Sequence, residues 1–242
     1  MDAPRRLRDR LALITGATRG IGRAIALAYA KEGAHVILVG RTTGALEEVD
    51  DEIRAAGGAA TLLTLNLRQH DKIDALGPTI YQRWGKLDIL VGNAGILGPL
   101  SPLNHITAEA WNEVLEINLN ANWRLIRTLD PLLRRSEAGR AIFVSSGAAV
   151  SRPAYWGPYS VSKAALEALV QTYAREIENS SVRANLVNPG PTRTGMRAKA
   201  FPGEDPASLK KPEDTTPTFV RLAEASCTDN GRVFDLKTGD VR

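Results

Sequence analysis

Tyr159 and Lys163 lie four residues apart in the stretch GPYSVSKAALEAL, which otherwise has the pattern of an amphipathic helix. Residues i and i+4 share one face of a helix, so a phenol and an ammonium group at this spacing can point into one site. A free phenol has a pKa of about 10, and a nearby cation favours its ionised form. The pair can therefore be a proton donor and acceptor tuned toward neutral pH. The same spacing also fits two unrelated surface side chains, so the rest of the chain has to decide.

A second candidate site is a turn with three glycines, Gly16, Gly20 and Gly22, which follows an apolar segment and directly precedes a helical pattern. Glycines let the backbone approach a pyrophosphate, and the helix N-terminus supplies free N–H groups and a positive dipole end. Glycines also simply form turns, but this position between a strand and a helix favours a dinucleotide site.

Apolar segments of strand length alternate with helical patterns along the whole chain. The expected strands are 11–16, 35–40, 61–67, 87–95, 141–146, 182–190 and, more weakly, 232–236. Four helices are expected. The first begins near residue 21, the second ends before the glycine pair 57–58, and the third covers 73–80. The fourth runs from Thr107 to about Leu129 and is stopped near Pro131. Continuous rather than alternating hydrophobicity indicates strands covered on both faces. We therefore predict a Rossmann-type α/β fold: a doubly wound parallel sheet in three layers, with 1–242 as a single domain and ligands beyond the carboxyl ends of the strands.

Two segments do not follow this alternation. Residues 1–10 form a short basic N-terminal tail containing RRLRDR, which we expect to be a solvated terminus. Residues 191–217 contain several prolines and charges with little periodicity. Loops of this length are usually functional or disordered, so the segment is predicted to be a substrate lid, with a disordered insertion as the alternative.

Composition excludes several functions. The formal charge of +4 is scattered along the 242 residues without an aromatic-basic array, so no nucleic-acid partner is expected. The single Cys227 and the dispersed His35, His70 and His105 give no disulfide and no metal-ligand pattern. The chain has no run of eighteen apolar residues and no apolar secretion signal at its N-terminus, so we expect no membrane partner and a cytoplasmic protein.

Six motifs in order along the chain resemble those of the short-chain dehydrogenase/reductase family. T-G-x-x-x-G-I-G is matched at 15–22, N-A-G at 93–95, the Asn of the long helix at Asn118, the Ser after strand five at Ser146, Y-x-x-x-K at 159–163, and P-G-x-x-x-T at 189–194. Two positions depart from the pattern: Gly92 replaces the first Asn of N-N-A-G, and Asn66 replaces an Asp near the adenine ring. An amide can still accept a hydrogen bond from the adenine amino group, so adenine binding is expected to persist. The 188–206 segment also resembles a bacterial subgroup of the family whose substrate is not settled.

The resemblance implies a set of cofactor-binding residues at the carboxyl ends of the strands. They are Gly16, Thr18, Arg19, Gly20, Ile21, Gly22, Arg41, Thr42, Asn66, Leu67, Asn93, Ala94, Gly95, Tyr159, Lys163, Pro189, Gly190, Thr192 and Thr194. An acidic residue at the end of strand two would accept hydrogen bonds from the ribose of NAD, but Gly40 and Arg41 stand there instead. Two guanidinium groups, from Arg19 and Arg41, can hold a 2′-phosphate. The sequence therefore favours NADP(H) over NAD(H).

The resemblance also implies the chemistry. Tyr159 gives a proton to a carbonyl oxygen that Ser146 holds, while hydride comes from the nicotinamide. Lys163 binds the nicotinamide ribose and lowers the pKa of Tyr159, and Asn118 holds a water that links Lys163 to solvent. Ser146 is chosen over Ser145 because neighbouring residues of a strand point to opposite faces.

The predicted function is thus an NADP(H)-dependent oxidoreductase that interconverts a small-molecule carbonyl and a secondary alcohol. The alternative is a protein of the same fold that binds a dinucleotide as a sensor or scaffold without turnover. Pro153, Tyr155 and Trp156 are expected to shape an apolar, aromatic substrate pocket. The lid cations Arg193, Arg197 and Lys199 can receive an acidic group or be solvated. The resemblance implies a homodimer or homotetramer, formed through the long helix with Trp111 and the helix after Tyr159.

Overall fold

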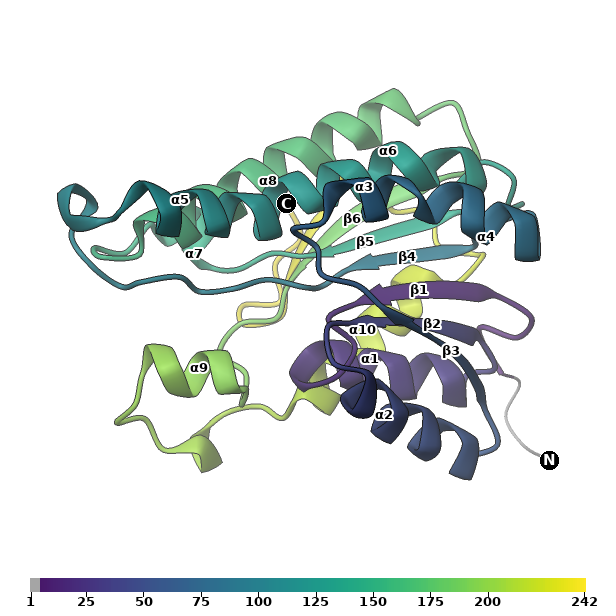
Figure 1. Ribbon diagram of the computed structural model, residues 1–242, viewed down its shortest axis with the longest axis horizontal. Helices are drawn as coiled ribbons and strands as arrows, with labels where there is room; N and C mark the ends of the chain where they lie inside the picture. The colour runs from purple at the N-terminus through teal and green to yellow at the C-terminus, as the bar shows by residue number, and fades with distance from the viewer. Residues whose placement is uncertain (1–4) are drawn as a thin grey trace.

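The computed structural model describes residues 5–242, in which seven parallel strands form one sheet with helices on both faces (Figure 1). The strands are β1 (Leu11–Thr15), β2 (His35–Gly40), β3 (Ala59–Thr64), β4 (Ile89–Gly92), β5 (Arg140–Val144), β6 (Arg183–Asn188) and β7 (Val233–Asp235). Their order in the sheet, β3-β2-β1-β4-β5-β6-β7, reverses direction between β1 and β4. The predicted doubly wound, three-layer α/β fold in a single domain is therefore confirmed, and its ligand crevice is expected at this reversal.

The helices form the two outer layers of the molecule (Figure 1). One face of the sheet is covered by α1 (Gly20–Lys31), α2 (Thr43–Ala55) and α10 (Thr216–Ala223). The other is covered by α3 (His70–Asp74), α4 (Leu76–Trp84), α6 (Ala121–Leu133) and α8 (Gly157–Glu176). The remaining α-helices are α5 (Ala108–Leu115), α7 (Ala148–Ser151) and α9 (Gly195–Ala200). No helix within residues 5–242 is both long and apolar enough to cross a membrane.

Each buried strand serves both cores, which explains its continuous hydrophobicity. In β1, Leu11 and Leu13 pack into the core under α4, α6 and α8, whereas Ala12 and Ile14 pack into the core under α1, α2 and α10. Side chains alternate between the two faces of a strand, so a strand covered on both sides must be apolar at every position.

The helix expected at 73–80 is two helices in the structure. Pro78 has no N–H to donate to the carbonyl of Asp74, and the Thr128 hydroxyl donates to that carbonyl instead, at 2.8 Å. The chain therefore ends α3 at Asp74 and starts α4 at Leu76.

The long helix was expected to end at about Leu129 and to stop near Pro131, and it ends close to that proline, at Leu133. Pro131 lies inside α6, which continues to Leu133, and the N–H of Arg134 still bonds to the carbonyl of Asp130 at 2.9 Å. A proline removes one backbone N–H donor, and a helix can continue past it when the missing hydrogen bond lies in the last turn. A π-helical turn at Glu116–Asn120 joins α5 to α6.

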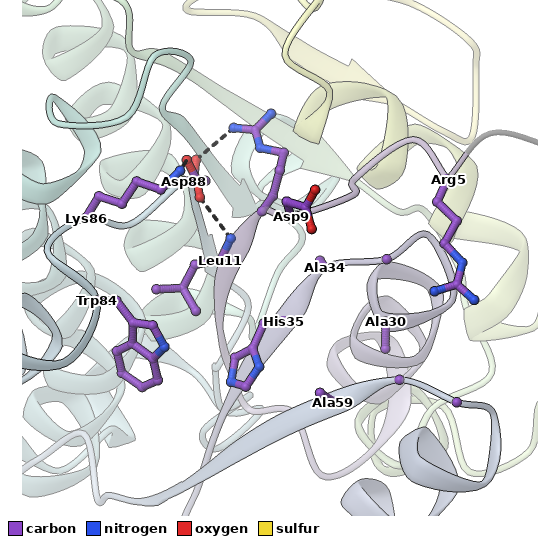
Figure 2. Close-up of a pocket in the computed structure, with 14 residues that line it drawn as sticks. Arg5, Asp9, Leu11, Ala30, Ala34, His35, Ala59, Trp84, Lys86 and Asp88 are labelled. Carbon is purple, nitrogen blue, oxygen red and sulfur yellow. Dashed lines mark hydrogen bonds and ion pairs between the residues drawn. The ribbon is translucent and has the colours of Figure 1, made fainter.

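The basic tail is less solvated than the sequence suggested. Residues 1–4 lie outside the described part of the chain, but Leu7 is fully buried and Arg10 is only 8% exposed. Arg10 donates to the carbonyls of Ala223 at 2.6 Å and Asp88 at 3.2 Å, and burial lowers its pKa. The residue is thus part of the sheet's amino edge, beside a cavity of about 470 Å³. Leu11, His35 and Ala59, the first residues of β1, β2 and β3, line this cavity (Figure 2).

The structure divides the proline-rich segment 191–217 into a base and a projecting part. A parallel bridge between Thr192 and Lys210 closes its base. Beyond the bridge, Thr215 is fully buried and α10 packs against the sheet. The segment that projects from the body is therefore 193–209 and contains α9 (Figure 1).

Candidate active site

Backbone conformation and close packing account for the three glycines of the turn after β1. Gly16 and Gly20 have φ of +65° and +55°, a conformation that favours glycine. A Cβ at Gly22 would lie less than 3 Å from Nδ2 of Asn93 and from the carbonyl of Gly16. The first turn of α1 has no side-chain cap, so its N–H groups are open to an anionic ligand.

The N-A-G segment after β4 is fastened to this turn. The Thr15 hydroxyl accepts from the N–H groups of Asn93 and Ala94 at 3.0 and 3.1 Å. In return, the Asn93 amide donates to the carbonyls of Thr15 and Gly16 at 2.8 and 3.2 Å. These bonds end β4 at Gly92, short of the expected 87–95 strand, and set the 93–95 backbone against the glycine turn.

The P-G-x-x-x-T segment meets the glycine turn from the other side. Gly190 has φ of +69°, and Thr194 caps α9 by accepting from the N–H of Arg197 at 3.2 Å. A Cβ at Gly20 would lie 3.4 Å from Cγ2 of Thr194. The base of the 193–209 segment, with Pro189 and the buried Thr192, therefore lies beside the glycine turn.

Arg19, Arg41 and Thr42 are all exposed at the carboxyl ends of β1 and β2. Neither arginine forms an ion pair with any residue of 5–242. Gly40 beside them is tightly packed, since a Cβ there would lie 2.7 Å from Cγ2 of Thr18. Two unpaired cations thus flank the place where a nucleotide ribose is expected.

Asn66 and Leu67 lie next along the sheet, after β3. Asn66 is exposed, and its Oδ1 accepts from the N–H of Arg68 at 3.1 Å. Leu67 is 8% exposed. The structure therefore gives the Asn66 amide a local turn-forming role besides any contact with a ligand.

Asn118 is completely buried within the π-helical turn. Its Oδ1 accepts from the N–H of Ile96 at 2.8 Å, and its Nδ2 donates to the Ile96 carbonyl at 2.9 Å and to Ser162 Oγ at 3.0 Å. The extra residue of a π turn re-aims side chains, which is why such turns recur at functional sites. In this structure Asn118 fastens the 95–96 backbone to α8, and its predicted water-holding role remains a prediction.

Ser146, and not Ser145, lies beside Tyr159. Tyr159 is 7% exposed, and burial raises the pKa of its phenol while the hydrogen bond with Ser146 opposes that rise. The Ser145 hydroxyl points elsewhere and donates to Glu167 at 2.6 Å. The alternation of side chains along the end of β5 separates the two serines, as expected.

Lys163 is 4% exposed, and burial lowers its pKa to about 8. Its ammonium group donates to the carbonyl of Val144 at 2.8 Å and lies 5.8 Å from the centroid of the Tyr159 ring. The expected lowering of the Tyr159 pKa by Lys163 is not what the structure shows. Burial dominates at both groups, because the ammonium is directed at a carbonyl rather than at the phenol oxygen.

Aromatic side chains connect the Tyr159 phenol to the projecting segment. Trp156 packs edge-on against Tyr159, with ring centroids 5.9 Å apart. Its ring is tilted by 41° against that of Phe201, with centroids 5.6 Å apart. Tyr155 has φ of +71°, an uncommon conformation for a residue with a side chain. Phe201 was missed from the sequence, although it is the one aromatic residue of 191–217.

Arg197 is not available to an acidic substrate group. Its guanidinium group binds both carboxylate oxygens of Glu204, at 2.6 and 2.5 Å, and lies 3.7 Å from the Phe201 ring centroid. Arg193 and Lys199 are exposed. The lining that the structure places against Tyr159 is apolar, with Leu97, Ala148, Trp156, Met196 and Ala200.

Comparison with known proteins agrees with this arrangement. The family model for short chain dehydrogenase matches residues 10–205, which is most of the chain. The chain belongs to the short-chain dehydrogenase family.

Two solved short-chain dehydrogenases share the whole fold. One from Pseudomonas syringae is 43% identical with a TM-score of 0.93, and 97% of each chain is covered. One from Shigella flexneri, solved in complex with NADP, is 38% identical with a TM-score of 0.93, covering 97% of this chain and 100% of that one. The Escherichia coli protein YciK, named an uncharacterized oxidoreductase, is 39% identical over 237 residues, covering 96% of this chain and 94% of YciK. The chain is thus an oxidoreductase of this family, similar throughout its length to relatives whose names give no substrate.

Proposed function

We propose that the protein is an NADP(H)-dependent oxidoreductase that interconverts a carbonyl compound and a secondary alcohol, with Tyr159 as the general acid and base. The observation that carries this is the meeting of Tyr159, Ser146 and Lys163 at the carboxyl ends of β4 and β5, across from the glycine turn. Bound in this crevice, NADPH would supply the hydride that the side chains cannot.

The residues present fit a phosphorylated dinucleotide. The positions of Gly16 and Gly22 exclude side chains, so a pyrophosphate can approach the uncapped start of α1. Arg19 and Arg41 are exposed and have no ion-pair partner within 5–242, which suits a 2′-phosphate. The NADP complex of the Shigella flexneri relative supports the same choice.

Each polar residue has one task in the proposed reaction. Ser146 donates a hydrogen bond to the carbonyl oxygen, and Tyr159 transfers its proton to that oxygen. The raised pKa of Tyr159 keeps the phenol protonated, as reduction requires. Lys163 would contact the nicotinamide ribose, and Asn118 holds the 95–96 backbone in place.

The apolar wall indicates the kind of substrate and sets the test. Ketones and aldehydes of increasing apolar size are incubated with the protein and NADPH, and the loss of NADPH absorbance is followed. We expect turnover by the wild type and none by Tyr159→Phe. Tight NADPH binding without turnover of any carbonyl would instead identify a dinucleotide sensor or scaffold.

The homodimer or homotetramer and the cytoplasmic location are part of this proposal. The family resemblance supports both. Light scattering on the purified protein measures the oligomeric state, and fractionation of the source cells measures the location.

A further inference from the structure

Glu167 is a buried carboxylate on the face of α8 that carries the proposed chemistry. Tyr159, Lys163 and Glu167 follow one another at intervals of four residues, so they form a row along the helix. Glu167 is 6% exposed. A carboxylate is costly to bury unless it is paired, so its partners indicate what it does.

Its partner in the sheet is Ser145. The Ser145 hydroxyl, in a residue only 2% exposed, donates to Oε1 of Glu167 at 2.6 Å, and Arg242 donates to the same oxygen at 2.8 Å. The N–H of Ser145 is bonded to the carbonyl of Val187 in β6 at 2.8 Å. Fixing both the backbone and the side chain of Ser145 prevents rotation of the strand end, and so sets the direction in which Ser146 points.

The neighbouring positions of the strand end are held by the same helix face. Lys163 donates to the carbonyl of Val144 at 2.8 Å, and Ser146 lies beside Tyr159, where it lowers the pKa of the phenol. Residues 144, 145 and 146 thus meet residues 163, 167 and 159 one by one. The contacts of residues 144 and 146 involve groups assigned to the reaction, and residue 145 lies between these two residues in the chain.

We propose that Glu167 is a positioning residue, which through Ser145 holds the end of β5 so that Ser146 meets Tyr159 in the reactive geometry. The inference rests on the proposed function, because it concerns the placement of Ser146 for proton transfer. Hydrogen bonds to an ionised acceptor are short and strong, which suits a positioning contact. A displacement of about 1 Å at a reacting group can cost about a hundredfold in rate.

The test compares Ser145→Ala, Glu167→Ala and the double variant with the wild type. We expect each single variant to lower kcat by about tenfold or more, with KM and the Kd for NADPH within about twofold of the wild type. The double variant should be no slower than the slower single variant, because both single changes break the same hydrogen bond between Ser145 and Glu167. Glu167→Gln keeps an oxygen that can accept from Ser145, so its kcat should fall less than that of Glu167→Ala.

Ser136→Ala is the matched control. Ser136 also donates to a buried carboxylate, that of Asp88, but at the amino edge of the sheet. The Ser136→Ala variant should lose stability as the Ser145→Ala variant does, but its kcat should stay within about twofold of the wild type. A kcat for Ser145→Ala equal to that of Ser136→Ala, or an effect on KM alone, overturns the positioning role.

The remaining outcomes are also decisive. If Ser145→Ala does not fold, Glu167→Ala and Glu167→Gln carry the same comparison, and equal kcat values for those two overturn the inference. A wild type that reduces no carbonyl overturns the proposed function and this inference together. An active wild type whose Ser145→Ala variant matches the control overturns the inference alone.

Discussion

Removing the Arg41 guanidinium group should weaken NADPH and leave NADH almost unchanged. Arg41 is exposed at the end of β2 and has no ion-pair partner within 5–242, so Arg41→Ala breaks no contact of that kind in the described protein. NADPH carries a 2′-phosphate where NADH has a neutral hydroxyl. The change therefore acts on the one group that distinguishes the two cofactors.

The exposure of Arg41 limits the size of the effect. A hydrogen bond to a charged group contributes about 1.5–3 kcal/mol, whereas an exposed ion pair contributes about 0.2–1 kcal/mol. A solvated guanidinium group on a bound phosphate lies between these ranges, at about 1–1.5 kcal/mol, or about five- to twelvefold in affinity. Adding Arg19→Ala should raise the loss to about thirtyfold or more if the two contributions add.

The assay is kcat/KM for NADPH and for NADH, measured for each variant at one fixed salt concentration. Arg83→Ala is the control, because Arg83 is an exposed arginine of α4, beside Trp84 at the cavity of the amino edge. Raising the salt from about 0.05 to about 0.5 M should reduce the Arg41 effect by screening. A wild type that prefers NADH, or an Arg41→Ala variant that loses both cofactors equally, would refute the reasoning.

Reversing the preference requires a change at position 41 rather than at Gly40. A Cβ at Gly40 would lie 2.7 Å from Cγ2 of Thr18 and 3.0 Å from Cδ2 of Leu46, so Gly40→Asp would disturb the turn itself. Arg41→Asp places the acidic group at an exposed position and should repel the phosphate. Its kcat/KM ratio of NADH to NADPH should exceed that of Arg41→Ala.

Three further outcomes are expected. Tyr159→Phe should lower kcat by about 10²–10⁴-fold with the Kd for NADPH nearly unchanged, and a variant that keeps half of the wild-type rate would contradict the acid assignment. Because burial lowers the pKa of Lys163 to about 8 from its ordinary 10.5, its contribution to stability is present above pH 10.5 and is lost as the pH falls through 8. Between pH 8 and 10, the free energy of unfolding measured by chemical denaturation should therefore rise by about 2 kcal/mol more for the wild type than for Lys163→Met. Parallel plots of this free energy against pH for the two proteins would contradict the prediction. Gly92→Asn should lower the Tm, since a Cβ there would lie less than 3 Å from the Phe143 ring, whereas Gly44→Ala, with open space around it, should not.

The seven strands could be located from the sequence because each contains a short run of apolar residues. Their ends were less predictable. The expected 87–95 strand stops at Gly92, since the amide of Asn93 turns to bond with Thr15, a residue 78 positions away. The helix expected at 73–80 is divided because the hydroxyl of Thr128 in α6 donates to the Asp74 carbonyl, to which Pro78 has no N–H to donate. Both deviations arise from contacts between segments distant in the chain.

The same distinction between local spacing and long-range contacts holds for the candidate site. The row formed by Tyr159 and Lys163 was predictable, because helical spacing alone places them on one face. Glu167 continues that row, but nothing in its type or spacing distinguishes it from a solvated residue of α8. Its burial and its bond to Ser145 depend on how α8 packs against the end of β5.

The sequence by itself determined the order of the elements, the parallel sheet and the residue types that the chemistry needs, because hydrophobic period and local spacing are properties of neighbouring residues. Only the tertiary structure decided the environment of each group. The pKa of Tyr159 is raised rather than lowered, Arg197 is neutralised by Glu204, and Arg10 is buried at the amino edge of the sheet. Burial and charge pairing are set by whichever side chains the fold brings together, and these come from distant parts of the chain.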